Sequence, residues 1–277
     1  MVDNLLFFEK DPFSPIKYAY EIEQVLHREQ SDYQEILVLE CAHFGRVLVL
    51  DGVVQVTERD EFIYHEMLAQ VVLHAHPDPQ NVLIIGGGDG GTVREVAKHE
   101  TVKGIHLVEL DPRVVEVSKQ FLPTIATSFD DPRLDVIHTD GAKFLQQTAH
   151  NFDLIIVDCT DPVGPAQVLF SEEFFADAAS RLTPDGMFVA QTESLHFHRP
   201  FVAEVQRKLS RVFTIADLCT APIATYAGNW WTFSIGSRKH DPRIQARACV
   251  VPTTYYADDV HAHTFLPKSL YRKLIGE

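Results

Sequence analysis

The sequence predicts an α/β protein in which a doubly wound parallel sheet follows a small antiparallel β domain. Over most of the chain, short continuous apolar runs such as 82–85 and 105–108 alternate with helix-like segments, as buried parallel strands with helical crossovers do. Earlier, strand-forming runs at 33–39 and 46–50 follow one another without a helix, which favours antiparallel pairing. With 277 residues, 45% of them hydrophobic, the chain is long enough to bury a core in each part.

The region 1–57 is expected to form the small β domain. Asp51-Gly52 separates the run 46–50 from the run 53–56. An Asp-Gly pair is a preferred two-residue turn between antiparallel strands, because both positions tolerate a positive φ. A hairpin is therefore expected at this point.

A helix is expected between this domain and the first buried strand. Thr57 or Asp60 can cap its N-terminus, since either side chain can accept a hydrogen bond from the first turn. The helix should end near His76, because Pro77 and Pro79 cannot continue it. The side chains expected along its apolar side are Phe62, Met67, Leu68 and Val71.

The region 58–277 is expected to form the doubly wound domain. After the first helix the expected order is strand 82–85, helix 92–99, strand 105–108, helix 112–122, strands 134–138 and 152–157, helix 171–182, strand 186–191, helix 199–211 and strands near 212–219 and 230–236. The tail from about residue 240 has mixed patterns and no predicted order. Ligands of such sheets bind beyond the carboxyl ends of the strands, where several of these runs end in a glycine or an acid.

The acidic composition excludes several classes of partner. A formal net charge of −15 argues against binding nucleic acid or anionic lipid through bulk charge.

No apolar run approaches the roughly 20 residues that span a bilayer, and no secretory signal is visible at the N-terminus. The 4 cysteines form no C-x-x-C pair, which fits a reducing cytoplasm. The 14 histidines show no H-E-x-x-H or finger spacing, so no metal site is expected.

A glycine-rich loop, 86–91, follows the first buried strand and opens a helix. Glycines let the backbone approach a ligand closely, and a helix N-terminus offers unpaired N–H groups. Glu109 ends the next strand, where an acid can accept hydrogen bonds from ribose hydroxyls. These residues indicate an adenosine-bearing ligand, either a dinucleotide or a sulfonium. Asp89 would repel a pyrophosphate but attract an ammonium or a sulfonium, although a tight turn with a solvated aspartate leaves the same pattern.

Acids also end the third and fourth buried strands. Asp140, followed by Gly141, can accept a hydrogen bond from an exocyclic adenine amine or simply belong to an ordinary strand-to-helix turn. Asp158 and Asp161 come at the end of the next strand, in a loop with two prolines. One carboxylate can take a proton from an amine nucleophile while the other holds that amine in line. A turn with exposed acids is the competing interpretation.

Tyr64 and Tyr226 are candidates for the walls of a site for an alkyl chain. Each combines an apolar ring with a hydroxyl that can reach a polar end of a ligand, although core packing explains most aromatic residues equally well. Cys159 lies beside acids that disfavour a thiolate, so it is expected to pack rather than react. No G-x-S-x-G nucleophile elbow is present.

Taken in order, six segments resemble the spermidine synthase (polyamine aminopropyltransferase) family. They are D-G-V-V-Q-V-T-E-R-D-E-F-I-Y-H-E-M (51–67), L-I-I-G-G-G-D-G-G (83–91), V-E-L-D (108–111), D-C-T-D-P-V-G-P-A (158–166), V-A-Q-T-E-S (189–194) and T-Y-A-G-N-W-W-T-F (225–233). Each segment alone is weakly specific, but all six in this order are highly specific. The resemblance runs from about Tyr33 to the C-terminus, and it implies a Rossmann-like, class I methyltransferase-like domain after the β domain.

The resemblance implies a reaction in which decarboxylated S-adenosylmethionine, a co-substrate rather than a cofactor, donates its aminopropyl group to putrescine. The products are spermidine and 5′-methylthioadenosine, and the chemistry requires no metal. By match to the family pattern, Asp158 is the base that deprotonates the attacking amine, Asp89 holds the aminopropyl ammonium and Glu109 holds the ribose. The other residues matched to the donor site are Gln34, Asp140, Gly141 and Pro165. The residues matched to the acceptor site are Tyr64, His65, Asp89, Asp158, Asp161 and Tyr226.

The sequence departs from the family pattern at positions expected near the acceptor. Ala224 and Ala227 stand where the family commonly has prolines, which would loosen the wall beyond the diamine. Leu195-His196 stands where the family often has Pro-Trp, and the segment 5–8 lies near the place of an early tryptophan. Putrescine is the expected acceptor, with a longer diamine or agmatine left open.

Three other functions stay open on the residues alone. One is an S-adenosylmethionine methyltransferase on the same fold, as in the plant putrescine methyltransferases that resemble this family; Asp89 together with Asp158 and Asp161 favours aminopropyl transfer. The second is a nucleoside- or polyamine-binding module without turnover. A nicotinamide dehydrogenase is the least favoured, since the loop acid opposes a pyrophosphate. Because the family usually forms dimers or tetramers, a homodimer or homotetramer is expected, with the apolar N-terminal strands as its interface.

Overall fold

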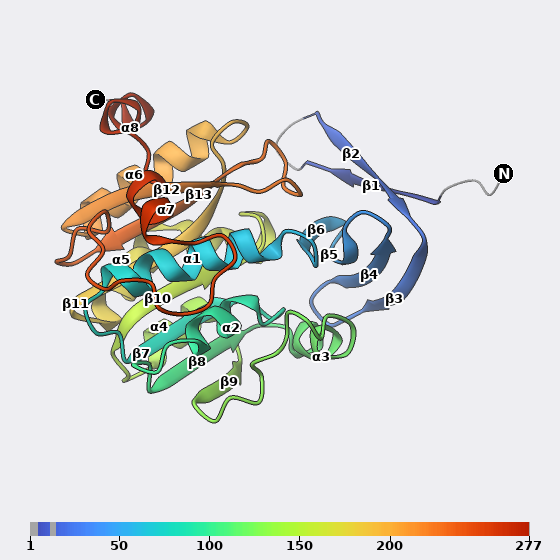
Figure 1. The fold of residues 1–277 in the computed structure, drawn as a ribbon, viewed down its shortest axis with the longest axis horizontal. Helices are drawn as coiled ribbons and strands as arrows, with labels where there is room; N and C mark the ends of the chain where they lie inside the picture. Colours follow the sequence, from blue (N-terminus) through green and yellow to red (C-terminus); the bar gives the residue numbers. More distant parts are fainter. Residues whose placement is uncertain (1–4, 12–14, 277) are drawn as a thin grey trace.

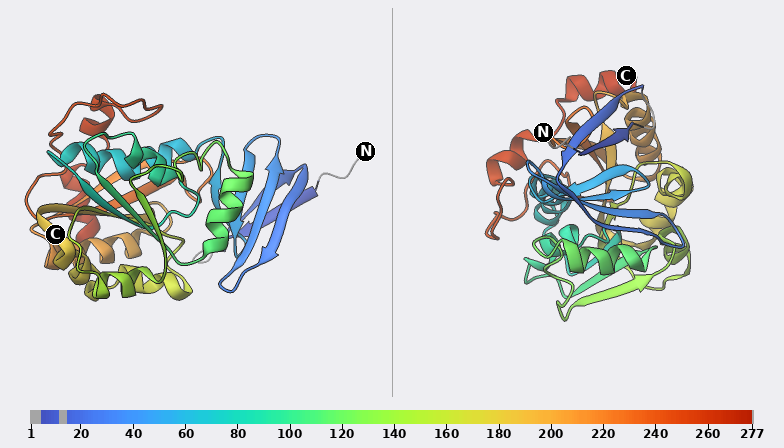
Figure 2. Two further views of the ribbon diagram at one scale, coloured as in Figure 1. Left: turned by 90° about the horizontal axis from the view of Figure 1, so that it is seen from below. Right: turned by 90° about the vertical axis from the view of Figure 1, so that its right-hand side faces the viewer.

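The computed structural model describes residues 5–11 and 15–276, with Pro165 described by its backbone alone. It contains an N-terminal region of antiparallel strands and a larger region in which helices cover a central sheet (Figure 1). The two regions lie side by side, and one helix of the larger region stands against the N-terminal strands (Figure 2).

The N-terminal region consists of a two-stranded and a four-stranded antiparallel sheet. The strands are β1 (Leu5–Lys10), β2 (Lys17–Ile22), β3 (Gln24–Gln30), β4 (Glu35–Cys41), β5 (Gly45–Leu50) and β6 (Val53–Thr57). The expected hairpin between β5 and β6 is confirmed, with Leu50 paired to Val53. Asp51 and Gly52 have φ of 47° and 81°, the left-handed conformation at both central positions that a two-residue hairpin requires.

The central sheet has seven strands in the order β12-β13-β11-β10-β7-β8-β9. They are β7 (Asn81–Gly86), β8 (Gly104–Glu109), β9 (Leu134–His138), β10 (Phe152–Asp158), β11 (Leu182–Ser194), β12 (Ile215–Pro222) and β13 (Trp230–Ser237). The expectation of a parallel sheet is wrong at one edge, because β13 runs antiparallel to both β11 and β12. The link 223–229 is too short for a helical crossover, so the chain turns directly back.

Helices cover both faces of this sheet (Figures 1 and 2). They are α1 (Glu61–Ala75), α2 (Gly91–Ala97), α3 (Pro112–Phe121), α4 (Gly141–Gln147), the 3-10 helix η1 (Gly164–Phe170), α5 (Glu172–Arg181), α6 (Arg199–Val212), α7 (Asp258–His263) and α8 (Lys268–Ile275). α1 and α2 share one core with Val82 and Ile84, and α5 and α6 share another with Leu83 and Ile85, as alternating side chains of β7 require. Among the described residues, no helix has the length and apolar content to cross a membrane.

α1 begins and ends as expected but is not capped as expected. Asp60 occupies the N-cap position, yet its side chain accepts no hydrogen bond from the first turn. The carboxylate accepts instead from the hydroxyl of Thr57 at 2.6 Å and from the backbone N–H of Thr225 at 2.9 Å. Asp60 therefore connects the start of α1 to the loop that carries Tyr226, a contact that propensity could not reveal.

α1 is also buried on nearly all sides, where an amphipathic helix was expected. The reason is the segment after β13, which crosses the outer side of α1 (Figure 1). Glu66, which is 1% exposed, accepts hydrogen bonds from three consecutive backbone N–H groups, those of Thr254, Tyr255 and Tyr256, at 2.7–2.8 Å. A buried carboxylate with three donors holds this segment onto the helix.

Replacing Glu66 by glutamine should lower the free energy of unfolding by about 1–3 kcal/mol, because the amide nitrogen would face N–H groups that it cannot accept from. Urea denaturation followed by far-UV circular dichroism measures this loss. Glu173→Gln, at an exposed carboxylate of α5, is the matched control and should change stability by less than about 0.5 kcal/mol. Equal losses in the two variants would contradict the prediction.

Candidate active site

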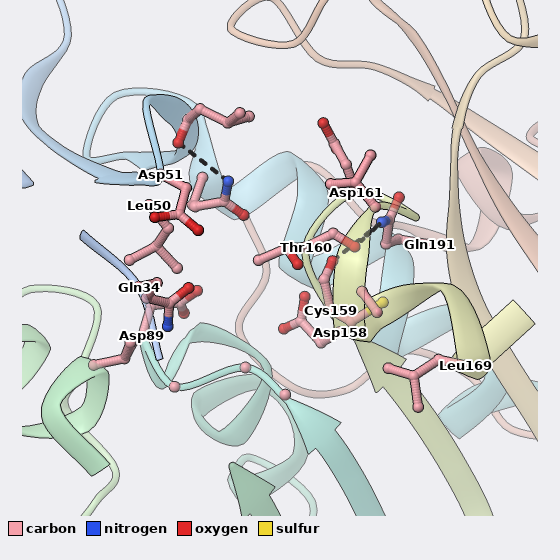
Figure 3. A pocket seen from close by; sticks show the side chains of 18 of the residues that line it. Gln34, Leu50, Asp51, Asp89, Asp158, Cys159, Thr160, Asp161, Leu169 and Gln191 are labelled. Carbon is pink, nitrogen blue, oxygen red and sulfur yellow. Dashed lines mark hydrogen bonds between the residues drawn. The ribbon is translucent and has the colours of Figure 1, made fainter. Parts of the chain in front are cut away.

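A cavity of about 300 Å³ lies beyond the carboxyl ends of β7, β8 and β10, where the N-terminal strands close over the central sheet. Figure 3 shows Gln34, Leu50 and Asp51 on one side of this cavity and Asp158 and Asp161 on the other. The location agrees with the expectation for ligands of a doubly wound sheet. Residues of the N-terminal strands and of the central sheet therefore line the cavity together.

The glycine loop forms the floor of the cavity between β7 and α2. Gly86, Gly87 and Gly90 have φ of 80°, 72° and 86°, which side chains other than glycine rarely adopt. The N–H of Gly87 donates to the backbone oxygen of Asp158 at 2.7 Å, which ties the loop to the end of β10. A Cβ at Gly88 would lie 2.9 Å from Oε2 of Glu109. The loop therefore brings backbone directly against the acids at the strand ends.

Glu109 and Gln34, two residues expected at the donor site, both line the cavity. Glu109 accepts from the N–H of Asp111 at 3.0 Å, and burial raises its pKa to about 7. The side-chain amide of Gln34 donates to Asp111 at 3.1 Å. Asp111 therefore holds together two residues that are far apart in sequence and come from different regions.

Asp140 and Gly141 line the same part of the cavity. Asp140 also caps α4, because its carboxylate accepts from the N–H of Lys143 at 2.9 Å, as the turn interpretation expects, while its role toward a ligand stays a prediction. A Cβ at Gly141 would lie only 2.3 Å from Cγ2 of Ile85, which explains a glycine here by close packing. The backbone of Pro165 lies in η1, and its side chain lies outside the described residues.

Asp158 lies at the centre of the cavity and is 8% exposed. One carboxylate oxygen accepts from the hydroxyl of Tyr64 and the other from the hydroxyl of Thr92, each at 2.6 Å. Burial and the neighbouring charge of Asp89 outweigh these hydrogen bonds and raise the pKa of Asp158 above its ordinary value. A buried carboxylate with raised proton affinity, held in one orientation, suits a general base.

His65 is clamped between two carboxylates next to Asp158. Its Nε2 lies 3.2 Å from Asp89 and its Nδ1 lies 2.6 Å from Glu61. Burial alone would lower the pKa of His65, but the two acids hold it well above its ordinary value. His65 contacts Asp89 but is buried and does not itself line the cavity. This position differs from its expected place in an acceptor site.

Tyr64 and Tyr226 form an aromatic wall, as expected. Their rings meet edge to face with centroids 5.6 Å apart, and Tyr226 also packs on Trp231 at 4.6 Å. The hydroxyl of Tyr64 is used by Asp158, and that of Tyr226 donates to the backbone oxygen of Gln55 in β6. Both residues line the cavity, and both hydroxyls already have partners within the protein.

The far end of the cavity carries acids that the sequence reasoning missed. Asp161 is joined there by Glu9, Asp11 and Glu193, and by His198. His198 lies 3.0 Å from Glu193 and 3.3 Å from Asp11. Burial raises the pKa of Glu9 and of Glu193 to about 7, and burial with the charge of Glu193 raises that of Asp161 well above its ordinary value. Acids so crowded favour a cationic ligand, which would relieve their mutual repulsion.

The sequence contains a signal for Glu193 as a site residue, but none for Glu9 and Asp11. Glu193 comes two residues after the predicted strand 186–191 and inside the matched segment 189–194, so the search for acids that follow strand ends would have found it. It has a φ of 70°, unusual for a residue with a side chain and typical of functional positions. Glu9 and Asp11 belong to the N-terminal hairpin, a part of the expected β domain in which no individual strand was placed, and only the tertiary structure brings them here.

The departures from the family pattern lie mostly away from the cavity. Leu195 is buried in a small core under α6 and α8, and His196 is exposed. Of all the residues at which the sequence departs from the family pattern, only Ala227 lines the cavity. Leu195 and His196 are therefore not in the wall of the cavity, where they were expected, although Glu193 and His198 on either side of them do line it.

Comparisons with known proteins cover nearly the whole chain. A family model described as spermine/spermidine synthase domain matches residues 61–246, and one described as spermidine synthase tetramerisation domain matches residues 5–58. Polyamine aminopropyltransferase 1 of Aquifex aeolicus (strain VF5) is 52% identical over 273 residues, which cover 99% of this chain and 98% of that protein. The polyamine aminopropyltransferase of Bacillus subtilis (strain 168) is 46% identical over 251 residues, covering 90% and 91%.

Solved structures agree with this similarity. A spermidine synthase in complex with the transition-state analogue AdoDATO superposes with a TM-score of 0.94 at 36% identity, covering 99% of this chain and 96% of that one. The spermidine synthase from Thermotoga maritima gives 0.91 at 35% identity, covering 99% and 95%. The expected Rossmann-like, class I methyltransferase-like fold is confirmed. The chain belongs to the spermine/spermidine synthase family of enzymes.

Proposed function

We propose that this chain transfers the aminopropyl group of decarboxylated S-adenosylmethionine to putrescine, giving spermidine and 5′-methylthioadenosine. One observation carries the proposal beyond family membership: the buried carboxylate of Asp158 lines the same cavity as the residues proposed for a nucleoside, such as Glu109 and Gln34, and as the crowded acids around Asp161. A base in that cavity would meet the acceptor amine where the donor presents its propyl carbon.

On the donor side, Glu109 would accept hydrogen bonds from the ribose hydroxyls, and Asp89 would hold the aminopropyl ammonium. Gln34, Asp140, Gly141 and Pro165 complete the proposed nucleoside site. Because Asp89 is an anion, it would disfavour ordinary S-adenosylmethionine, whose additional carboxylate it would repel. No cofactor and no metal is needed for this chemistry.

In the proposed step, the neutral acceptor nitrogen attacks the propyl carbon bonded to sulfur. The carbon–sulfur bond breaks, its electron pair stays on sulfur, and the sulfonium becomes the neutral thioether of methylthioadenosine. The attacking nitrogen gives its proton to Asp158, which Tyr64 and Thr92 hold in place. Orientation and proton transfer suffice, because the sulfonium is already an activated leaving group.

On the acceptor side, the crowded acids would bind the second ammonium of the diamine. Asp161 stands nearest in sequence to the proposed base, and Glu9 and Glu193 line the same end. The rings of Tyr64 and Tyr226 would enclose the methylene chain. An acceptor without a distal cation, such as propylamine, would leave these acids uncompensated.

Incubation of the enzyme with putrescine and each of the two donors tests the proposal. Methylthioadenosine should form from the decarboxylated donor alone, with spermidine as the second product in mass detection. Formation of adenosylhomocysteine would instead indicate a methyltransferase, and binding without turnover would indicate a polyamine-binding module. Cadaverine, agmatine, spermidine and propylamine, offered in parallel, rank the acceptors.

We also propose a homo-oligomer, either a dimer or a tetramer, formed through the N-terminal strands. Leu5, Leu6 and Phe8 of β1 are 48–61% exposed, an apolar edge that a second chain would cover. The tetramerisation domain model that matches residues 5–58 supports this assignment. The division into domains 1–57 and 58–277, and a cytoplasmic location, stay predictions.

A further inference from the structure

Three potential metal ligands meet beside the glycine loop. Nε2 of His65 and one carboxylate oxygen each of Asp89 and Asp158 all lie within 4.8 Å of one another. Within the part of the chain that the structure describes, no other group of three histidine, cysteine or acidic residues is close enough to share one ion. Zinc bonds of about 2.0–2.2 Å require ligand atoms about 4 Å apart or less, so small side-chain rotations would close the triad.

The surroundings orient these ligands as metal sites do. Glu61 holds Nδ1 of His65 at 2.6 Å, which aims Nε2 at Asp89, and Arg94 in turn holds Glu61 through two hydrogen bonds of 2.8 Å. A ligating histidine commonly makes this contact with a carboxylate through its second nitrogen. Asp89 accepts from the N–H of Gly91 at 2.7 Å, and Asp158 is held by two hydroxyls.

Charge and donor type then select the class of ion. When an ion replaces the proton between His65 and Asp89, the triad presents one neutral imidazole and two carboxylates, whose charge a divalent cation balances. Glu61 adds no further negative charge to the site, because the guanidinium of Arg94 neutralises it. An imidazole with two carboxylates suits Zn²⁺ or Co²⁺ better than Mg²⁺ or Ca²⁺, which prefer oxygen ligands alone.

We propose that His65, Asp89 and Asp158 form an inhibitory site for a divalent transition-metal ion in the substrate-free enzyme. The site goes beyond the proposed function, but its inhibitory effect rests on it: the ion would occupy the carboxylates assigned to the donor's ammonium and to proton transfer. Transition-metal ions would therefore exclude the aminopropyl end of the donor while leaving the nucleoside part of the cavity accessible.

Titration of the chelator-treated, tag-free enzyme with Co²⁺ tests the site without any substrate. We expect one bound ion per chain, with ligand-field absorption bands in the visible range that Zn²⁺ abolishes. His65→Gln should remove these bands. Glu61→Gln, which changes only the contact behind the histidine, should weaken Zn²⁺ binding about 10–100-fold. Asp89→Asn is a second ligand variant in case His65→Gln fails to fold, as judged by circular dichroism.

His263→Gln is the matched control, because His263 is exposed on α7 and far from the triad in sequence. It should bind Co²⁺ and Zn²⁺ as the unmodified enzyme does. Unchanged bands and affinity in folded His65→Gln or Asp89→Asn would overturn the proposal, as would a failure of the unmodified enzyme to bind one ion. Neither result depends on turnover, so the metal site can fail while the proposed function stands.

Competition locates the ion relative to the proposed substrates. Decarboxylated S-adenosylmethionine should displace bound Co²⁺, whereas methylthioadenosine, which lacks the aminopropyl group, should not. Displacement by both compounds alike, or by neither, would place the ion elsewhere and contradict the assignment. In initial-rate measurements, Zn²⁺ should raise the apparent KM for the donor.

Discussion

Replacement of Asp158 by asparagine should lower the turnover number for aminopropyl transfer by about 10²–10⁴-fold, the usual contribution of a positioned general base. Asparagine has nearly the same shape, so one oxygen can still accept from Tyr64, while the amide cannot take the proton of the attacking amine. Steady-state rates of methylthioadenosine release measure the loss. Binding of methylthioadenosine, followed by calorimetry, should change little because the residues proposed to hold it, such as Glu109 and Gln34, are left intact.

Asp135→Asn provides the control for this experiment. Asp135 is an aspartate on β9 of the same sheet, but its side chain is 64% exposed and does not line the cavity. Its removal should leave the turnover number unchanged. A turnover number of Asp158→Asn within a few-fold of the unmodified enzyme would show that another group deprotonates the amine, and would contradict the role proposed for Asp158.

Replacement of Gly86 by alanine should be the most destabilising single methyl addition in the glycine loop. Gly86 has a φ of 80°, and an added Cβ would lie 2.1 Å from the backbone oxygen of Asp158 and 2.8 Å from its carbonyl carbon. Backbone cannot rotate away as a side chain can, so β7 and β10 would have to separate. We expect a loss of more than about 4 kcal/mol in the free energy of unfolding, together with loss of activity.

Gly52→Ala separates the two causes of this loss, which are the left-handed backbone conformation and the steric clash of the added Cβ. Gly52 has nearly the same φ, 81°, but no atom lies within 4 Å of an added Cβ. It should therefore show only the cost of the left-handed conformation, about 1–2 kcal/mol. Denaturant unfolding of both variants measures the difference. Similar losses would mean that the close approach of Gly86 to Asp158 contributes nothing.

The strand ends were predictable because their pattern is local. Apolar runs that stop at the glycine loop, at Glu109, at Asp140 and at Asp158 imply buried parallel strands, whose carboxyl ends meet at one edge of a sheet. The structure places all of these residues around one cavity, as that reasoning requires. The reversal of β13 escaped prediction, because an apolar run reads the same in either strand direction.

The supporting contacts were not predictable, because they join residues distant in sequence. Thr92 donates to Asp158 from the start of α2, and Arg94 of the same helix holds Glu61, the partner of His65. Asp60 was expected to cap a helix, but its carboxylate accepts a hydrogen bond from the backbone N–H of Thr225 instead. Each such contact depends on where tertiary packing brings a side chain.

The sequence by itself determined the fold class, the edge of the sheet that carries the site and, through six ordered segments, the family, because local patterns and motifs carry that information. The tertiary structure decided what else enters the cavity. It brings Glu9 and Asp11 from the N-terminal hairpin to the acidic end, and it directs Leu195 and His196 away from it. The physical reason is that burial and much of the charge crowding arise between segments: Asp89 raises the pKa of Asp158, and Glu193 raises that of Asp161.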